Sequence, residues 1–167
     1  GLDTGSILLQ KSLMIDKDDT YPILDDKLAT IGLQALLEAI PAYIEGKLEL
    51  KPQDNSKATQ CSQLTRENGK IDWNKSATEI YNLYRGLTPW PGVWSTWNNK
   101  RLKLLQIKIS NKKIKPGLVV VENNKMYIGC SKGSVEILKL QLEGKKEMNA
   151  NNFITGHQDI NNALLYV

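Results

Sequence analysis

Residues 93–142, VWSTWNNKRLKLLQIKISNKKIKPGLVVVENNKMYIGCSKGSVEILKLQL, decide the fold of this chain. Short runs rich in Val, Ile and Leu alternate here with turns that contain Asn, Gly or Pro, a pattern typical of antiparallel strands. The predicted strands are Val93–Trp97, Leu102–Ser110, Gly117–Glu122, Lys125–Cys130 and Ser134–Leu142. The turns between them are Asn98-Asn99, Lys115-Pro116-Gly117, Asn123-Asn124 and Lys132-Gly133. Five strands over about 50 residues predict a small antiparallel β-barrel, closed or partly closed, and an oligonucleotide/oligosaccharide-binding (OB-like) barrel is the best candidate.

A short amphipathic helix and a rigid corner precede these strands. The helix spans about residues 77–84, with Asn74 or Ser76 as its expected cap and Gly86 as its expected end. Two prolines then flank Trp90 and restrict the backbone. Trp90 could stack on a nucleic-acid base. The favoured interpretation is that Trp90 and Trp94 pack into the end of the barrel.

The N-terminal third predicts only a piece of an α/β unit. Residues 7–15 are expected to form a strand, and apolar residues recur at helical spacing over 23–44. Asp19 or Thr20 is the expected cap, Gly46 the expected end, and Pro41 should kink the last turn or separate two helices. One strand and one helix cannot enclose a core, so residues 1–50 are expected to be the end of a larger domain. Residues 51–70 are expected to be a linker or a docked connector, and residues 71–167 are expected to form the C-terminal domain. Within that domain, residues 149–156 are expected to form a short helix or turn.

The composition of the 167 residues is that of an ordinary globular protein, with 41% hydrophobic and 24% charged residues. No apolar run approaches the roughly 18 residues of a membrane span, and no signal-peptide pattern opens the chain. Because it starts with Gly1 rather than Met, we expect an internal part of a longer protein. Two cysteines and one histidine (His157) predict a reduced, cytoplasmic protein without a metal site. We expect it to be a monomer.

Charge is unevenly distributed along the chain. Residues 1–70 contain 8 Lys/Arg and 11 Asp/Glu, whereas residues 71–167 contain 14 Lys/Arg and 7 Asp/Glu. A basic C-terminal half indicates a polyanionic partner, with nucleic acid ahead of membrane. A solvated lysine-rich surface is an equally good interpretation of charge alone.

The basic residues concentrate in the first predicted hairpin, beside Trp94 and Trp97. Strand alternation places Arg101 and Lys103 on one face and the neighbouring leucines on the other. Such a face matches a groove that follows phosphates, although lysines also protect edge strands from aggregation. Arg85 is either an ion-pair partner or a phosphate contact. The predicted nucleic-acid-binding residues are Arg85, Lys100, Arg101, Lys103, Lys108, Lys145 and Lys146.

Several motifs together resemble the methionyl-tRNA formyltransferase family over nearly the whole chain. They are Gly1-Leu2-Asp3-Thr4-Gly5, Pro52-Gln53-Asp54, Ala58-Thr59, Gly69-Lys70-Ile71-Asp72-Trp73, Tyr84-Arg85-Gly86-Leu87-Thr88-Pro89-Trp90-Pro91-Gly92, Pro116-Gly117, Leu140-Gln141 and Gly144-Lys145-Lys146-Glu147-Met148. The combination of the Pro-Trp-Pro stretch with the later Gly-Lys-Lys is specific, whereas Asp-Thr-Gly alone is not. Other formyltransferases share such a C-terminal domain.

The resemblance implies a two-domain enzyme that transfers a formyl group from 10-formyltetrahydrofolate to the amino group of methionyl-initiator tRNA, in bacterial or organellar translation initiation. An N-terminal Rossmann-like domain would bind the folate and hold an Asn, a His and an Asp, of which the Asp corresponds to Asp3. A C-terminal barrel would help to bind the tRNA. The predicted fold class is therefore α+β: an OB-like antiparallel β-barrel preceded by a linker and the last strand and helix of a truncated Rossmann-like formyltransferase domain.

The Asn, the His and a Ser-Leu-Leu-Pro loop of the family would precede Gly1. We therefore expect the 167-residue chain to bind no folate, to transfer no formyl group and mainly to supply tRNA binding. Two alternatives stay open. The chain could be a free-standing OB-like module that binds single-stranded nucleic acid without catalysis, or a protein-interaction domain whose basic face is incidental.

Overall fold

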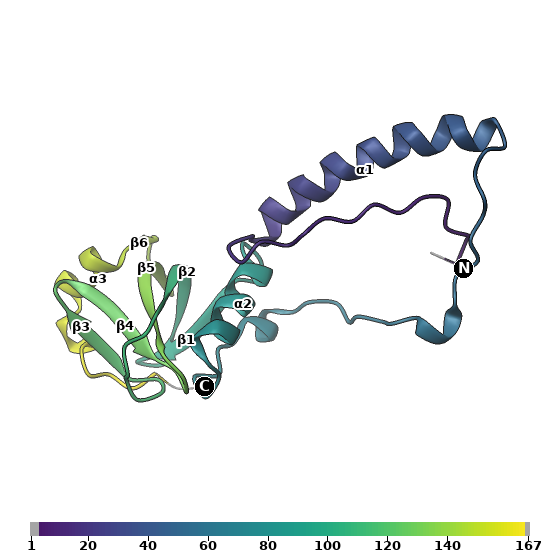
Figure 1. Cartoon of the computed structure of the whole chain (residues 1–167). Helices are drawn as coiled ribbons and strands as arrows, with labels where there is room; N and C mark the ends of the chain where they lie inside the picture. Colours follow the sequence, from purple (N-terminus) through teal and green to yellow (C-terminus); the bar gives the residue numbers. More distant parts are fainter. Residues whose placement is uncertain (1–3, 166–167) are drawn as a thin grey trace. The chain divides into compact units, whose positions relative to one another are not determined.

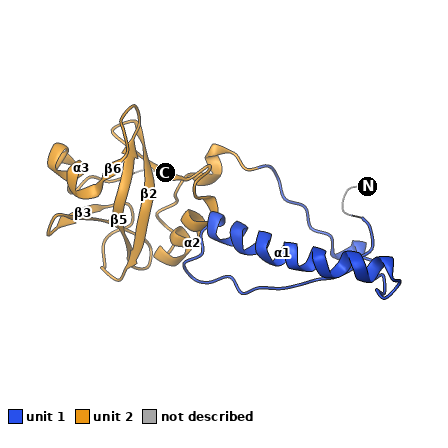
Figure 2. Ribbon diagram, turned by 90° about the horizontal axis from the view of Figure 1, so that it is seen from above, with its two compact units in different colours: residues 1–63 blue, residues 64–167 orange. Residues whose placement is uncertain are grey.

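The computed structural model describes residues 4–165, and Asp3 lies outside them. The chain divides into two compact units, Gly1–Gln63 (unit 1) and Leu64–Val167 (unit 2), which Figure 2 colours separately. Unit 1 contains α1 (Tyr21–Ile44) and η1 (Asn55–Lys57). The remaining helices and all the strands of the described residues belong to unit 2.

Helix α1 is continuous through Pro41, so the expected separation into two helices was wrong. The predicted end is confirmed, because Gly46 has a φ of 68° just after the cap residue Glu45. The Gly46 N–H donates to the Tyr43 carbonyl at 3.1 Å, and the Lys47 N–H donates to the Ala42 carbonyl at 2.8 Å. This pair of bonds is a Schellman motif, which satisfies carbonyls left free at a helix end.

The start of α1 confirms Thr20 as the residue at the cap position, although its side chain makes no cap hydrogen bond. The buried Asp19 carboxylate accepts from the Lys27 ammonium at 2.8 Å. Lys27 also donates to Asp16 at 2.8 Å, and these two hydrogen bonds raise the pKa of Lys27. These ion pairs therefore hold the turn at residues 16–19 against α1.

The predicted strand over residues 7–15 was wrong. Only Ile7 pairs, in an isolated antiparallel bridge with Lys51, and Lys11 forms an ion pair with Glu38 of α1 at 2.5 Å. An extended segment becomes a sheet strand only when a neighbouring strand accepts and donates its backbone hydrogen bonds. The described residues of unit 1 supply no such strand beside residues 8–15.

One antiparallel sheet organises unit 2 (Figure 1). Its strands are β1 (Val93–Trp97), β2 (Lys100–Ser110), β3 (Val119–Glu122), β4 (Lys125–Gly129), β5 (Ser134–Leu142) and β6 (Met148–Asn149). They pair in the order β1-β2-β5-β4-β3, and β6 pairs with β5. The five strands predicted from residues 93–142 are confirmed, with boundaries that move by at most two residues.

The predicted Asn-Asn turns are confirmed as tight hairpin turns. Asn98 and Asn99 have φ values of 49° and 58°, and Asn123 and Asn124 have φ values of 50° and 59°. Two consecutive residues of positive φ match the right-handed twist of the flanking strands, and asparagine tolerates this conformation better than most residues.

Two helices enclose the core of unit 2 against the sheet. Helix α2 (Ala77–Leu87) packs against β1, β2 and β5, and α3 (Ala150–Gly156) packs against β4, β5 and β6. Single 3-10 turns, η2 (Arg66–Gly69) and η3 (Gln158–Ile160), lie before and after them. Fully buried residues of unit 2 include Ile71, Ile80, Leu102, Leu104, Val119, Met126, Ile128, Ile137, Leu140, Phe153 and Ile160.

One of the two caps predicted for α2 is confirmed, whereas its predicted end was wrong. Ser76 is the cap residue, and Glu79 completes a capping box by accepting from the Ser76 N–H at 2.9 Å and from its hydroxyl at 2.7 Å. Gly86 does not end the helix, which continues to Leu87. The predicted turn or helix at residues 149–156 is confirmed as α3.

The capping box predicts a pH-dependent stability. The hydrogen bonds from Ser76 lower the pKa of Glu79 below its ordinary value of 4.5, so the folded state favours the carboxylate. The resulting stabilisation is present above that value and is lost as the pH falls through the lower folded-state pKa. Urea unfolding should show wild type more stable than Glu79→Gln at neutral pH, with the difference shrinking as the pH falls below 4.5. A difference independent of pH would contradict this role of the carboxylate.

Both cysteines are free thiols. Cys61 is exposed, whereas Cys130 is buried at the end of β4, and burial raises the pKa of the Cys130 thiol to about 12. Cys130 is therefore a small apolar core residue rather than a reactive nucleophile.

Candidate nucleic-acid interface

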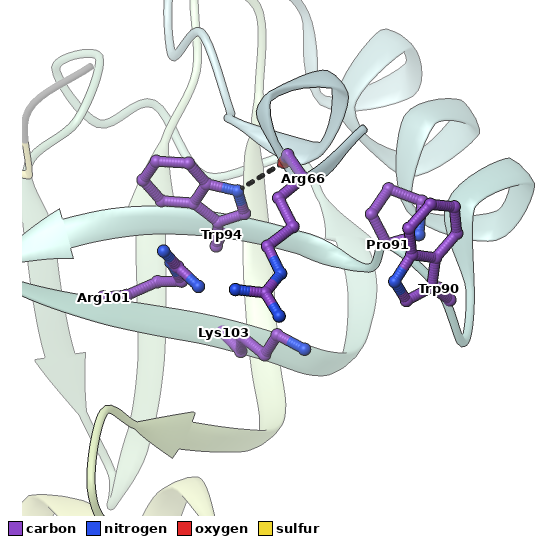
Figure 3. A pocket seen from close by; sticks show the side chains of 6 residues that line it. All are labelled: Arg66, Trp90, Pro91, Trp94, Arg101 and Lys103. Carbon is purple, nitrogen blue, oxygen red and sulfur yellow. Dashed lines mark hydrogen bonds between the residues drawn. The ribbon is translucent and has the colours of Figure 1, made fainter. Parts of the chain in front are cut away.

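A hollow of about 190 Å³ lies on the outer face of β1 and β2, beside η2 and the corner that follows α2 (Figure 3). We call it the cationic pocket. The residues that line it are Arg66, Trp90, Pro91, Trp94, Arg101 and Lys103. Three of its six lining side chains are cations, and none is a carboxylate.

Strand β2 supplies Arg101 and Lys103 to the pocket. They alternate with Leu102 and Leu104, which are 0% and 2% exposed on the opposite, core-facing side. Across the sheet, Arg101 pairs with Thr96 and Lys103 pairs with Trp94. The strand pairing thus confirms the prediction that Arg101 and Lys103 share a face.

The turn η2 supplies Arg66, which sequence reasoning missed because residues 51–70 read as a linker. The Trp94 indole Nε1 donates to the Arg66 carbonyl oxygen at 2.9 Å, and the Ile71 N–H donates to the Trp94 carbonyl at 2.9 Å. Figure 3 shows the Arg66 guanidinium pointing toward Arg101 and Lys103. No local pattern reveals this contact, because it depends on residues 66–71 docking on β1.

Gly69 makes this docking possible. A Cβ placed on Gly69 would lie 1.9 Å from the Gly92 carbonyl oxygen, so no side chain fits without a backbone shift. We expect Gly69→Ala to lower the free energy of unfolding of unit 2 by about 1–3 kcal/mol. Gly86→Ala is the matched control, because a Cβ there meets nothing within 4 Å, and inside α2 it should stabilise by about 0.5–1 kcal/mol. Urea unfolding of both variants measures the contrast, and equal effects would contradict the packing.

Arg101 is held against an aromatic ring. Its guanidinium carbon lies 5.0 Å from the Trp94 ring centroid, and the Lys70 ammonium lies 5.8 Å from the same ring. Such cation–π contacts orient a charged group without neutralising it. The Arg101 Nε is buried and has no hydrogen-bond partner among the described residues.

The pocket cations Arg66, Arg101 and Lys103 form no ion pair within residues 4–165. The Glu143 carboxylate accepts from the Arg101 backbone N–H at 2.9 Å. Neighbouring cations repel one another, so this arrangement favours occupation by an anion.

The favoured interpretation of the two tryptophans was wrong. Trp90 is 57% exposed and lines the pocket, and Trp94 is 8% exposed but lies outside the main core cluster, beneath Arg101. Trp73 and Trp97 are the tryptophans of that core cluster. The physical reason is that Trp94 shares the outward register of Arg101 and Lys103, while Trp90 belongs to the exposed corner before β1.

The other predicted binding residues do not line the pocket. Lys100 is exposed at the turn between β1 and β2, and Lys145 and Lys146 are exposed on the turn before β6. A second hollow of about 180 Å³ lies toward that turn, and its lining residues are Arg101, Lys103, Gln141, Glu143 and Gly144. Arg101 and Lys103 therefore line both hollows.

Lys108 and Arg85 each lie beside a different polar residue. Lys108 is exposed on β2 directly opposite Glu136 of β5. The half-buried Arg85 on α2 donates from Nε to the Asn82 Oδ1 at 2.9 Å. Neither residue lines the cationic pocket.

The His157 imidazole packs against two aromatic rings of unit 2. Its centroid lies 4.4 Å from that of Phe153 and 5.5 Å from that of Trp97. Among residues 4–165, no group of three or more His, Cys, Asp or Glu side chains is placed to hold a metal ion. A search of the same residues finds no helix with the length and apolar character to cross a membrane.

Comparisons with known proteins agree with this architecture. A methionyl-tRNA formyltransferase from Thermodesulfovibrio yellowstonii is 39% identical over 95% of this chain and 51% of its own length. One from Dehalococcoides mccartyi (strain CBDB1) is 41% identical over 100% of this chain and 54% of its own length. The chain thus spans about half the length of these curated relatives.

Solved structures share the fold at lower identity. HypX from Aquifex aeolicus in complex with tetrahydrofolic acid matches with a TM-score of 0.67 at 17% identity, over 91% of this chain and 28% of that one. WlaRD, a sugar 3N-formyl transferase, matches with a TM-score of 0.61 at 23% identity, over 87% of this chain and 52% of that one.

A family model ties these similarities to a defined part of the chain. Residues 63–158, which include every described strand and the whole cationic pocket, match the model of the formyl transferase C-terminal domain. This match assigns the β-rich unit 2 to that domain, and the chain belongs to the family of the formyl transferase C-terminal domain.

Proposed function

We propose that this chain is the C-terminal portion of a methionyl-tRNA formyltransferase and that it mainly supplies binding of initiator methionyl-tRNA. The whole enzyme would transfer a formyl group from 10-formyltetrahydrofolate to the amino group of methionyl-initiator tRNA. The observation that carries the tRNA role is the cationic pocket, where three cations line one hollow, without a lining carboxylate, beside an exposed tryptophan. The curated relatives of about 40% identity support the choice of enzyme.

Unit 1 supports the proposal that a larger domain belongs to this protein. Helix α1 exposes large apolar side chains, including Leu33 (58%), Leu36 (54%) and Leu37 (67%), and of its residues only Ala39 is buried. A stable helix of a globular protein normally buries such a face. We propose that residues 1–50 complete a Rossmann-like formyltransferase domain and that residues 71–167 form an OB-like tRNA-binding barrel. Residues 51–70 would connect the two, with residues 64–70 belonging to unit 2.

Formyl transfer itself would use residues of that larger domain. The methionyl amine forms a bond to the formyl carbon, the bond from that carbon to the folate nitrogen breaks, and a proton passes from the amine to the folate nitrogen. We propose that Asp3 sets the protonation state of a histidine and of the surroundings of the amine during this step. The 167-residue chain alone should bind no 10-formyltetrahydrofolate and transfer no formyl group.

Two further features belong to this proposal. We propose that the protein acts as a monomer in the bacterial cytoplasm, where initiator tRNA is charged and used. A free-standing module that binds single-stranded nucleic acid is the alternative. The exposed apolar side of α1 favours the enzyme, because a self-sufficient binding module has no use for an unpartnered helix.

Charge reversal on β2 tests the tRNA role. We expect Arg101→Glu/Lys103→Glu to weaken binding of the chain to all tRNAs alike by more than about tenfold, because backbone phosphates carry no sequence information. The matched control is Lys75→Glu/Lys132→Glu, which makes the same charge change on exposed lysines that do not line the cationic pocket. Fluorescence anisotropy with labelled tRNA measures both variants. Equal binding by the β2 variant and wild type would favour the protein-interaction alternative.

A further inference from the structure

We propose that the cationic pocket holds one phosphate of an RNA backbone while the base of an adjoining unstacked nucleotide lies against the Trp90 indole. The inference rests on the proposed tRNA binding and specifies it. A basic surface alone would contact several phosphates weakly and would not distinguish paired from unpaired nucleotides. The pocket, in contrast, combines a site for one anion with a flat apolar surface.

The three cations reach the same hollow from separate elements. Arg66 comes from η2, whereas Arg101 and Lys103 come from β2, and all three line one volume of about 190 Å³. Arginine presents paired N–H donors that match two phosphate oxygens, and lysine adds a point charge. A single phosphate group in this volume would therefore accept from all three side chains.

The position of the Arg101 guanidinium favours binding of such an anion. The Trp94 ring orients its guanidinium at 5.0 Å, and its Nε is buried without an acceptor. A buried guanidinium donor without a partner is unfavourable. A small rotation of the guanidinium toward a bound phosphate oxygen would supply the missing acceptor, so anion binding would relieve this cost.

The adjoining hollow does not serve the phosphate equally well. It shares Arg101 and Lys103, but Glu143 takes part in its lining. A carboxylate repels a phosphate, whereas on the opposite side of the same two cations Arg66 adds attraction. The phosphate is therefore assigned to the Arg66 side.

Trp90 gives the pocket its second component. It is 57% exposed and lines the pocket beside Pro91 (Figure 3). Every base has a flat face that stacks on an aromatic ring, but bases within a double helix are already stacked on their neighbours. Trp90 therefore selects an unpaired nucleotide next to the bound phosphate.

Coupling between the cations tests the single-phosphate site. We expect Arg66→Gln and Lys103→Gln each to weaken tRNA binding roughly tenfold and to lower the salt slope by about one phosphate. The double variant should lower the salt slope by the same amount, about one phosphate. Its loss of affinity should be smaller than the product of the two single losses, because both residues bind the same phosphate. Lys146→Gln combined with Arg66→Gln is the control, for which the two losses should multiply. Multiplying losses in the Arg66/Lys103 pair would overturn the single-phosphate site.

Fluorine NMR of the 5-fluorotryptophan-labelled chain tests the stacking. Trp90→Phe assigns the Trp90 resonance, and the buried Trp73 resonance serves as the internal reference. We expect initiator tRNA and a short single-stranded RNA to shift the Trp90 resonance, whereas a blunt RNA duplex should not. Trp90→Ala should weaken binding of the single strand by about tenfold, and Trp90→Phe should restore most of the affinity.

The outcomes separate this inference from the proposed function. If the chain binds tRNA but the Trp90 resonance is unmoved and the Arg66→Gln/Lys103→Gln variant binds like wild type, the pocket inference is wrong and the tRNA role stands. If tRNA does not bind while the single strand shifts Trp90, the tRNA role is wrong and the phosphate-and-base site stands. If neither RNA shifts Trp90, or if free AMP saturates the site as readily as the single strand, an RNA site in this pocket is overturned.

Discussion

Raising the salt concentration from about 50 to about 200 mM should weaken binding of initiator tRNA by the 167-residue chain by about 10²-fold. The pocket cations Arg66, Arg101 and Lys103 would together neutralise one phosphate, and the exposed Lys100, Lys145 and Lys146 would neutralise one each. About four counterions are then released on binding, and the logarithm of the affinity falls by about 3.6 for each tenfold rise in salt.

Anisotropy titrations at four salt concentrations measure the slope directly. An uncharged solute at matched osmolality is the control, because it leaves counterion release unchanged and should leave the affinity nearly constant. A shallow slope would show that few phosphates are contacted. In that case the basic composition of residues 71–167 would reflect only a solvated surface.

Replacing Trp73 by Ala should cost about 3–5 kcal/mol of the free energy of unfolding of unit 2. Trp73 is 2% exposed, and its indole Nε1 donates at 3.0 Å to the Ser95 hydroxyl, which belongs to a residue with 0% exposure. The substitution leaves a cavity in the core and removes the hydrogen bond to the Ser95 hydroxyl. A domain with a total stability of about 5–15 kcal/mol would lose a large part of it.

Trp90→Ala is the matched control for that experiment, because it makes the same chemical change at an exposed side chain. We expect it to alter the free energy of unfolding by less than about 1 kcal/mol. Urea unfolding followed by circular dichroism compares the two variants. A comparable loss for Trp90→Ala would mean that Trp90 stabilises the fold and is not available for stacking on a base.

Local chemistry along the chain was sufficient for much of the fold. The Asn-Asn turns and the β-branched runs of residues 93–142 each carry their structural preference in adjacent residues, and the strands form where these predict them. The same holds for Ser76 as a cap and for Gly46 at the end of α1, since both satisfy backbone groups within one helical turn.

Predictions failed where a partner from elsewhere in the chain decides the outcome. Residues 7–15 have the composition of a strand but lack a neighbouring strand in the described part of unit 1, so they form only the bridge at Ile7. Trp90 and Trp94 looked like core residues because they are large and apolar, yet the register of β1 and the corner before it place them on the outer face.

The residues of the candidate site also divide into those that local sequence predicts and those that depend on distant contacts. Residue order was sufficient to predict that Arg101 and Lys103 share a face, because strand alternation is a local property of the backbone. Contacts between distant segments place Arg66 and the exposed Trp90 in the same pocket lining, and they leave Lys108 and Arg85 outside it. The reason is that Arg66 and Arg101 are 35 positions apart. They meet only because Gly69 allows residues 66–71 to dock on β1, through a hydrogen bond between a backbone carbonyl and the Trp94 indole.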